Sequence, residues 1–346
     1  MALPILICDD SSFARKAIAR SLPDEWDVEI CFAEHGKQAI EKIEQGLAHV
    51  LFLDLNMPVM DGYETMKVIR QRDLPTMVIV VSGDVQEEAR KRVIEMGALD
   101  FIEKPIDNAK LFAILHKFGI YDGQSSSDQR QCSIKTGNSL EDKLDVFREM
   151  SNVAMGQAGN SLAKLLNIFV ELPVPNVSII HSNEIAMAIA EIDKNDAVSG
   201  VSKGFTSKNL RGEAVILFND THAKSLSALL HPDESSSQVQ NTNDIKQDHL
   251  ELEALMDVSN IIVGACLRGI AKQLDVDVTH TTPSILGLHC ELSELVEENV
   301  SRWEELILVE IAYSMPSVNI NFELLLLLPV DSLDLAFERF LSVREQ

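Results

Sequence analysis

The first 120 residues of this 346-residue chain predict a doubly wound α/β domain. Five apolar runs recur at intervals of about 25 residues and alternate with amphipathic stretches, which is typical of a parallel sheet covered by helices on both faces. The runs are ILIC (5–8), VEICFA (28–33), VLFLDL (50–55), MVIVVS (77–82) and DFIEK (100–104).

The rest of the chain predicts a linker and a duplicated α+β domain. Residues 121–140 are rich in Ser, Gln and Gly and lack periodicity, as linkers do. Within 141–346, a shift of 108 positions aligns EDKLDVFREMSNVAMGQAGNSLAKLL with DHLELEALMDVSNIIVGACLRGIAKQL. The shared shift predicts two copies of one unit, each opening with a long helix followed by strands. The copies span about 141–230 and 250–346, joined by a flexible loop at 231–249.

Composition argues against several classes of function. The net charge of −24 disfavours a nucleic-acid partner, and no basic helix-turn-helix segment follows the linker. The five cysteines are scattered without a C-x-x-C pair, which favours reduced thiols in a cytoplasmic protein. The N-terminus lacks a basic segment before its apolar run, and the LLLLL run at 324–328 is too short to cross a bilayer. We therefore expect no membrane insertion.

Polar residues follow the predicted strands of the first domain. Asp9 and Asp10 end the first strand, Asp54 the third, Ser82 the fourth and Lys104 the fifth. The carboxyl ends of parallel strands gather at one rim, so these side chains should meet there. Three carboxylates repel one another, and a bound Mg²⁺ would offset that repulsion. One carboxylate could then attack a phosphoryl donor while the metal neutralises the developing charge.

Two other interpretations of these acids are weaker. They could be ordinary strand-end acids without a ligand. The segment D-L-N-M-P-V-M-D-G could also be an EF-hand loop, but Pro58 stands where an oxygen ligand belongs and the segment continues a buried strand.

Four motifs carry a resemblance over residues 4–119. ICDD, LFLDLNMPVMDG, VVSG and FIEKP resemble the signatures of CheY-like response-regulator receivers. The resemblance implies a flavodoxin-like fold, Asp54 as the phosphoacceptor and a sensor histidine kinase as the phosphoryl source. It also implies that Asn56 and Asp84 tune the lifetime of the phosphoryl group. The implied Mg²⁺ ligands are Asp9, Asp10, Asp54 and the backbone carbonyl of Asn56, and the implied phosphoryl-sensing residues are Ser82, Phe101 and Lys104.

The first copy of the duplicated unit carries a second motif. Asp145, Glu149 and Asn152 are spaced i, i+4 and i+7, so they share one helix face, and Pro175 follows Asn152 after 22 residues. The pattern D-x3-E-x2-N-x22-P resembles the signature of the CheC/CheX/FliY phosphatases, which remove phosphate from phosphorylated CheY. The resemblance covers roughly 141–343.

That resemblance implies a role for each residue. An asparagine amide can donate to and accept from a water, so Asn152 would orient the nucleophile, and Glu149 would pair with the substrate receiver's lysine. Asp145 would cap or orient the helix. Because this pair must enter another molecule's pocket, we expect Glu149 and Asn152 to face solvent. If neighbouring chain covered them with no open approach, only the signal-accepting role would remain. The alternative is a solvated polar stripe on an amphipathic helix.

The second copy departs from the pattern. Asp257 stands where the first copy has a glutamate, and its side chain is shorter by one methylene. Glu253, Asn260 and Pro283 occupy the other positions. We therefore expect a strong site in the first copy and a weak or structural one in the second.

Two functions remain open at this stage. The first is a phosphatase acting on the phospho-aspartate of a CheY-like regulator in chemotaxis-type signalling. Its substrate could be a separate protein or Asp54 of the same chain, and we favour a separate protein, with phosphorylation of Asp54 tuning activity. The second is a non-catalytic module that docks on a flagellar-switch or CheD-like partner under control of the receiver.

Overall fold

The computed structural model describes residues 2–23, 25–121, 123, 139–181, 198–207, 210–230, 243–290 and 304–344. The predicted linker therefore lies almost wholly outside the described residues. The chain forms two compact units, Met1–Val153 and Ala154–Gln346. The division falls inside a long helix, α6 (Leu140–Leu166), and not in the predicted linker, because the first half of that helix makes its contacts with the first unit.

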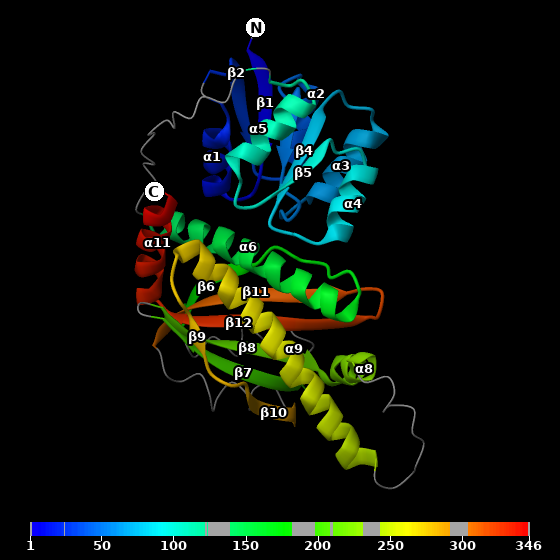
Figure 1. Cartoon of the computed structure of the whole chain (residues 1–346), viewed down its shortest axis with the longest axis vertical. Helices are drawn as coiled ribbons and strands as arrows, with labels where there is room; N and C mark the ends of the chain where they lie inside the picture. The colour runs from blue at the N-terminus through cyan, green and yellow to red at the C-terminus, as the bar shows by residue number, and fades with distance from the viewer. Residues whose placement is uncertain are drawn as a thin grey trace. The chain divides into compact units, whose positions relative to one another are not determined.

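The first unit is a parallel five-stranded sheet with the order β2-β1-β3-β4-β5. Each strand overlaps one of the five predicted apolar runs, with ends that agree within two residues. Helices cover both faces, as Figure 1 shows. The elements are β1 (Leu3–Cys8), α1 (Ser12–Ser21), β2 (Val28–Ala33), α2 (Gly36–Glu44), β3 (Val50–Leu53), α3 (Gly62–Gln71), β4 (Met77–Ser82), α4 (Glu87–Glu95), β5 (Asp100–Glu103) and α5 (Asn108–Lys117).

Alternate residues of each strand feed two separate cores. In β1, Ile5 and Ile7 pack with residues of α1 and α5, whereas Leu6 and Cys8 pack with residues of α2, α3 and α4. Successive side chains of a strand point to opposite faces, so a strand with helices on both sides must be apolar throughout. Burying both faces fixes the sheet and holds the carboxyl ends of β1, β3, β4 and β5 at one edge.

The second unit contains an antiparallel sheet made mostly of long strands. Their order is β10-β7-β8-β12-β11-β6, and the short strand β9 pairs with β7. Among the described residues, each predicted copy contributes a helix, three main strands and a further helix in the same order. The outer strand β6 pairs with β11 and the outer strand β10 with β7, so each copy's first strand joins the other copy. The elements are β6 (Asn176–His181), β7 (Val198–Thr206), β8 (Arg211–Asn219), α8 (Asp220–Leu230), α9 (Asn243–Leu274), β9 (Thr279–His280), β10 (Ser284–Cys290), β11 (Glu305–Met315), β12 (Ile320–Pro329) and α11 (Asp331–Arg344).

Helix α9 begins earlier than the sequence predicts. The loop was expected to run to residue 249, whereas the helix starts at Asn243, and residues 231–242 lie outside the described residues. The segment between Asn243 and Leu250 carries no Gly or Pro, so nothing in it opposes extension of the helix.

The segment His249–Leu274 of α9 is apolar and long enough to cross a membrane, but 67 % of its most apolar window is buried within the protein. The helix packs against the sheet through β7 and against α8, as a core helix does (Figure 1). The apolar character of α9 is therefore accounted for by packing.

Candidate phosphoacceptor site

The edge of the first sheet brings two of the predicted carboxylates to the predicted lysine. Lys104 Nζ lies 2.7 Å from Asp9 Oδ2 and 3.1 Å from Asp54 Oδ1. Asp9 and Asp54 are fully buried and Lys104 is almost so. The strand ends of β1, β3 and β5 thus place these groups together, as the sheet order requires.

Backbone amides orient both carboxylates. Ser11 N–H donates to Asp9 Oδ1 at 2.9 Å, and Asn56 N–H donates to Asp54 Oδ2 at 2.9 Å. Among the described residues, the other oxygen of each carboxylate accepts no well-aligned hydrogen bond and depends on the charge of Lys104. Each aspartate therefore has one oxygen held by a backbone amide and the other paired with Lys104.

The pocket holds more negative than positive charge. Burial raises the pKa of Asp54 well above its usual value, and the opposing pull of Lys104 is countered by Asp9 and Asp10. Burial and then Asp9 raise the pKa of Asp10 to about 7. Burial opposes the charged form of Lys104, but Asp54, Asp9 and Glu149 outweigh it and raise its pKa. Excess buried carboxylate of this kind favours a further cation.

The carboxylate oxygens of this pocket are chemically suited to bind a hard divalent metal ion. The carboxylates of Asp9, Asp10 and Asp54 offer oxygens, the ligand type that Mg²⁺ prefers. Within the described part of the chain, no three acidic, histidine or cysteine side chains are gathered as a metal-binding group. Lys104 lies within ion-pair distance of both Asp9 and Asp54, so a bound ion would share these carboxylates with it.

The remaining predicted residues of this site line its surroundings. Ser82 is fully buried at the end of β4, and its Oγ accepts the Asp84 N–H at 3.2 Å. Phe101 is buried in the core next to α2, α3 and α4. Both residues lie on strands adjoining the acidic pocket, on β4 and β5 respectively.

The first half of α6 enters the same pocket. Glu149 Oε2 lies 3.3 Å from Lys104 Nζ, and Asn152 Oδ1 accepts from Asn56 Nδ2 at 3.5 Å, the outer limit of a hydrogen bond. Glu149 and Asn152 are only 5 % and 4 % exposed. Our expectation that this pair faces solvent is therefore wrong, because the first unit of the same chain covers it.

Asp145 binds a different helix. Its Oδ2 accepts from Ser12 Oγ at 2.8 Å and from Phe13 N–H at 2.9 Å, at the N-terminus of α1. The first N–H groups of a helix lack intrahelical partners and attract negative charge. Asp145 thus accepts from the first turn of α1, whose N-cap is Ser11, and Arg148 Nη1 lies 3.9 Å from its Oδ1.

Gly83 is a contact residue that the sequence did not reveal. A Cβ placed on it would lie 3.1 Å from the carbonyl oxygen of Asn152 and 3.2 Å from Val153 Cα. The backbone of the β4–α4 loop therefore approaches α6 closely. A glycine after a strand is common in turns of every kind, so no local pattern marks this one as a helix contact.

Comparison with known proteins identifies the first unit. Residues 5–116 match the response regulator receiver domain family. These residues form a response regulator receiver domain. One relative is the protein-glutamate methylesterase/protein-glutamine glutaminase of Bacillus subtilis, 37 % identical over 109 residues. Another is protein-glutamate methylesterase/protein-glutamine glutaminase 3 of Geobacter sulfurreducens, 36 % identical over 102 residues. The matches cover 31 % and 29 % of this chain and 30 % and 27 % of the relatives, so the chain spans less than a third of their length.

Several solved structures resemble parts of the chain. Thermotoga maritima FliY covers 61 % of this chain and all of its own, with a TM-score of 0.45 and 15 % identity. The CheX–CheY–BeF3–Mg complex of Borrelia burgdorferi covers 34 % of this chain and 90 % of its own, with a TM-score of 0.32 and 29 % identity. The receiver of Thermotoga maritima CheB covers 36 % and 100 %, with a TM-score of 0.31 and 29 % identity. All three TM-scores are below 0.5.

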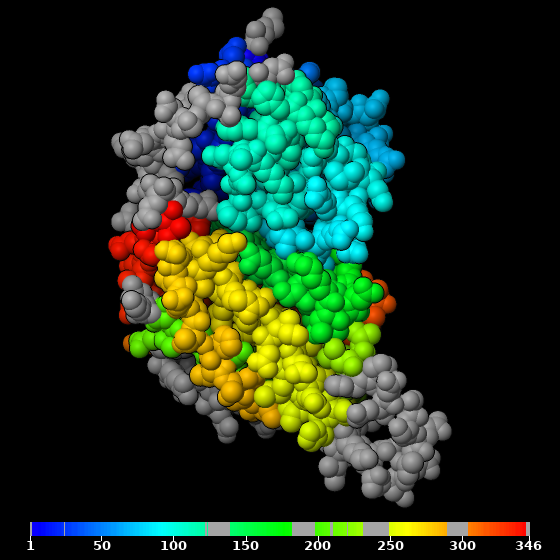
Figure 2. Space-filling view, in the orientation of Figure 1, coloured from blue at the N-terminus to red at the C-terminus, as the bar shows by residue number. Residues whose placement is uncertain are grey.

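The second-copy residues lie in a different environment from the first. Glu253, Asp257 and Asn260 are exposed on α9, which forms part of the surface in Figure 2. Asn260 Oδ1 accepts from Lys203 Nζ at 2.8 Å. Pro175 is buried and Pro283 is half-buried. The two copies therefore present the same pattern, one within the receiver pocket and one to solvent.

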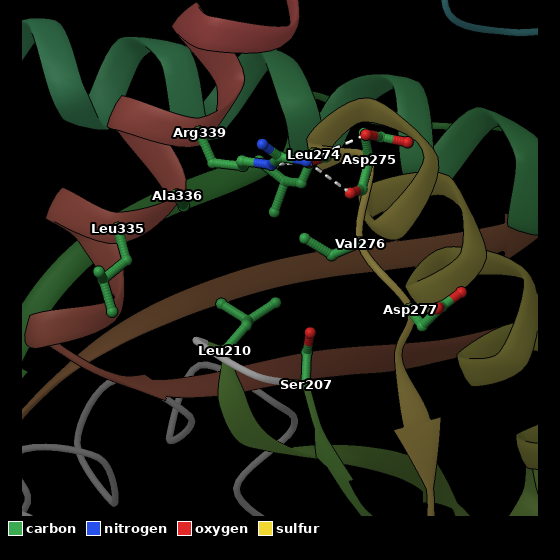
Figure 3. A pocket seen from close by; sticks show the side chains of 9 residues that line it. All are labelled: Ser207, Leu210, Leu274, Asp275, Val276, Asp277, Leu335, Ala336 and Arg339. Atoms are coloured by element: carbon green, nitrogen blue, oxygen red, sulfur yellow. Dashed lines mark hydrogen bonds and ion pairs between the residues drawn. The ribbon is translucent and has the colours of Figure 1, made fainter.

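A cavity of about 310 Å³ lies elsewhere in the second unit, between α11, the end of α9 and the start of β8 (Figure 3). Apolar side chains form much of its wall, among them Leu210, Val276 and Leu335. Arg339, also on the wall, is committed to the Leu274 and Asp275 carbonyl oxygens at 2.9 and 3.0 Å, where it closes the end of α9. The cavity contains none of the predicted site residues.

Asp84 provides a stability prediction. Burial raises the pKa of Asp84 from 3.8 to about 6, so the fold favours its neutral form and loses stability as pH rises from about 4 through 6. Asp84→Asn should keep the hydrogen bond from Gln86 N–H and raise the unfolding free energy by about 3 kcal/mol above pH 7. Near pH 5, urea unfolding should show that Asp84→Asn raises the unfolding free energy by about 1 kcal/mol less than it does above pH 7. Equal gains at both pH values would contradict the assignment.

Proposed function

We propose that this chain is a two-component response regulator whose second domain hydrolyses the aspartyl phosphate of a receiver. The observation that supports this most strongly is the ion pair of Glu149 with Lys104 at 3.3 Å, beside the phosphoacceptor Asp54. Through this ion pair, a residue of the α6 signature lies inside the pocket of a receiver. The duplicated order of elements in the second unit agrees with two copies of one CheC-like fold.

The receiver residues would bind and polarise the phosphoryl group. When bound, Mg²⁺ held by Asp9, Asp10, Asp54 and the Asn56 carbonyl would neutralise charge on the phosphoryl oxygens. Lys104 would pair with the phosphoryl group, and the Ser82 hydroxyl would donate a hydrogen bond to it. Phe101, packed in the core behind the pocket, would sense this change.

The α6 residues would supply the part of catalysis that a receiver lacks. Glu149 fixes the position of the helix through Lys104, and Asn152 holds one water against phosphorus without acting as a base. Water oxygen forms the new bond to phosphorus, and the bond from phosphorus to Asp54 breaks with its electron pair left on the carboxylate. Both protons of the water leave with the released phosphate, as dihydrogen phosphate. Positioning of this kind can lower a barrier by several kcal/mol.

The setting of this reaction follows from the receiver. A sensor histidine kinase would supply the phosphoryl group, and CheY-like regulators of chemotaxis-type signalling in the cytoplasm would be the other substrates. The exposed residues Glu253, Asp257 and Asn260 favour a second role, as a docking face for a flagellar-switch or CheD-like partner. The shorter Asp257 suits docking without hydrolysis.

The function is tested by phosphate release. The full chain is mixed with a panel of phosphorylated receivers from its source, and release is also followed from the chain itself. We expect acceleration of about 100-fold over spontaneous decay for at least one receiver, its own included, and its loss in the Asn152→Ala, Asn260→Ala double variant. Spontaneous rates throughout the panel would overturn the proposal and leave only the receiver's signal-accepting role.

A further inference from the structure

We infer that the first-copy pair, Glu149 and Asn152, acts on phospho-Asp54 of its own chain, so that one molecule both accepts and erases the signal. This inference rests on the proposed function and names its substrate. It reverses our expectation from the sequence, which favoured a separate regulator as the substrate of this pair.

The three signature residues contact three different loops around Asp54. Asp145 binds the β1–α1 junction at Ser12, Glu149 binds the β5–α5 loop at Lys104, and Asn152 binds the β3–α3 loop at Asn56. The i, i+4, i+7 spacing puts all three on one helix face, so a single rigid element makes every contact.

A fourth contact holds α6 close to the β4–α4 loop. The Gly83 backbone, in the β4–α4 loop, comes so close to Asn152 and Val153 that a single added carbon would be crowded. The helix therefore rests on every loop at this edge of the sheet that adjoins Asp54, and a glycine makes that approach possible.

One residue, Asn56, contacts both Asn152 and the acceptor Asp54. Asn56 contacts Asn152 through its side chain and Asp54 through its backbone N–H. Asn56 therefore links the Asn152 amide to the Asp54 carboxylate, and a water that attacks phosphorus would be held between these two groups. Because the amide contact is long, it can yield to such a water.

The arrangement also controls access to Asp54. Its side chain is fully buried, so a phosphodonor reaches it only when the residues around it move apart, and Glu149 of α6 is one of these. A separate phosphorylated receiver that uses Glu149 and Asn152 must likewise displace the chain's own receiver. Intramolecular contact gives the covalently attached receiver the advantage of a high effective concentration.

The test follows phosphate loss from Asp54 in the full-length chain. The chain is loaded from a labelled small acyl phosphate with Mg²⁺, the donor is removed, and release is followed over a wide dilution series. We expect a first-order rate constant that does not change with dilution and that falls about 100-fold in Asn152→Ala. Asn160→Ala, an asparagine change on the same helix outside the pocket, should retain the wild-type rate.

Two further experiments separate failure of this inference from failure of the proposed function. Glu149→Gln, which keeps the shape of the side chain, should slow release as well, and circular dichroism checks that both variants fold. Unphosphorylated wild-type chain added to phosphorylated Asn152→Ala chain at low concentration should not restore release. If wild type hydrolyses a separate receiver while its own Asp54 phosphate decays equally in wild type and Asn152→Ala, the inference is overturned and the proposed function stands.

Discussion

The Asp54→Asn chain is expected to take up no phosphoryl group from a small acyl phosphate or a kinase, whereas the wild-type chain does. Asp54 follows the central strand β3, and Asn56 N–H holds one of its oxygens while the other lies 3.1 Å from Lys104. The amide of asparagine keeps the shape and the hydrogen bond but has no anionic oxygen to form the new bond to phosphorus.

This substitution should also stabilise the fold. Burial raises the pKa of Asp54, so the ionised carboxylate costs folding free energy that a neutral amide does not. A higher unfolding free energy near neutral pH would show that lost uptake does not come from misfolding. Asp61→Asn serves as the matched control, because Asp61 caps α3 outside the pocket and asparagine is an equally good cap. Unchanged uptake in Asp54→Asn would place the acceptor on another carboxylate.

The Gly83→Val chain is expected to lift α6 from the receiver without altering any signature residue. The first added carbon would already lie 3.1 Å from the Asn152 carbonyl oxygen, and the branches of valine need more room still. Gly83 does not have a positive φ, so the receiver backbone should accept the side chain without strain.

The expected result is faster phosphoryl uptake and slower phosphate loss, each by about tenfold or more, since access and hydrolysis both depend on the position of α6. Uptake and loss of labelled phosphate measure the two effects. Gly83→Ala, with a single added carbon, should give a smaller change of the same sign. Faster uptake without slower loss would mean that α6 shields Asp54 but does not hydrolyse its phosphate.

The receiver was accessible from sequence because its signals are local. Continuous apolar runs predict buried parallel strands, and Asp9, Asp54 and Lys104 meet because each directly follows or ends such a run. The strand boundaries and the convergence of these side chains therefore needed no knowledge of distant contacts.

The position of the α6 signature was not accessible in the same way. A polar stripe on an amphipathic helix has the same pattern whether it meets water or a polar pocket, and Glu149 and Lys104 are 45 residues apart. The partner of Asp145 lies even farther away in sequence, at Ser12. Periodicity shows that three residues share a face, but it does not show what that face touches.

Amide hydrogen exchange at Phe13 tests most directly whether α6 occupies its own receiver. The Phe13 N–H donates to Asp145 from the N-terminus of α1, where helical N–H groups lack partners within the helix. We expect this amide in the full-length chain to be protected from exchange, and both Asp145→Ala and Gly83→Val to lower that protection about tenfold or more. Equal exchange rates in all three chains would contradict the account.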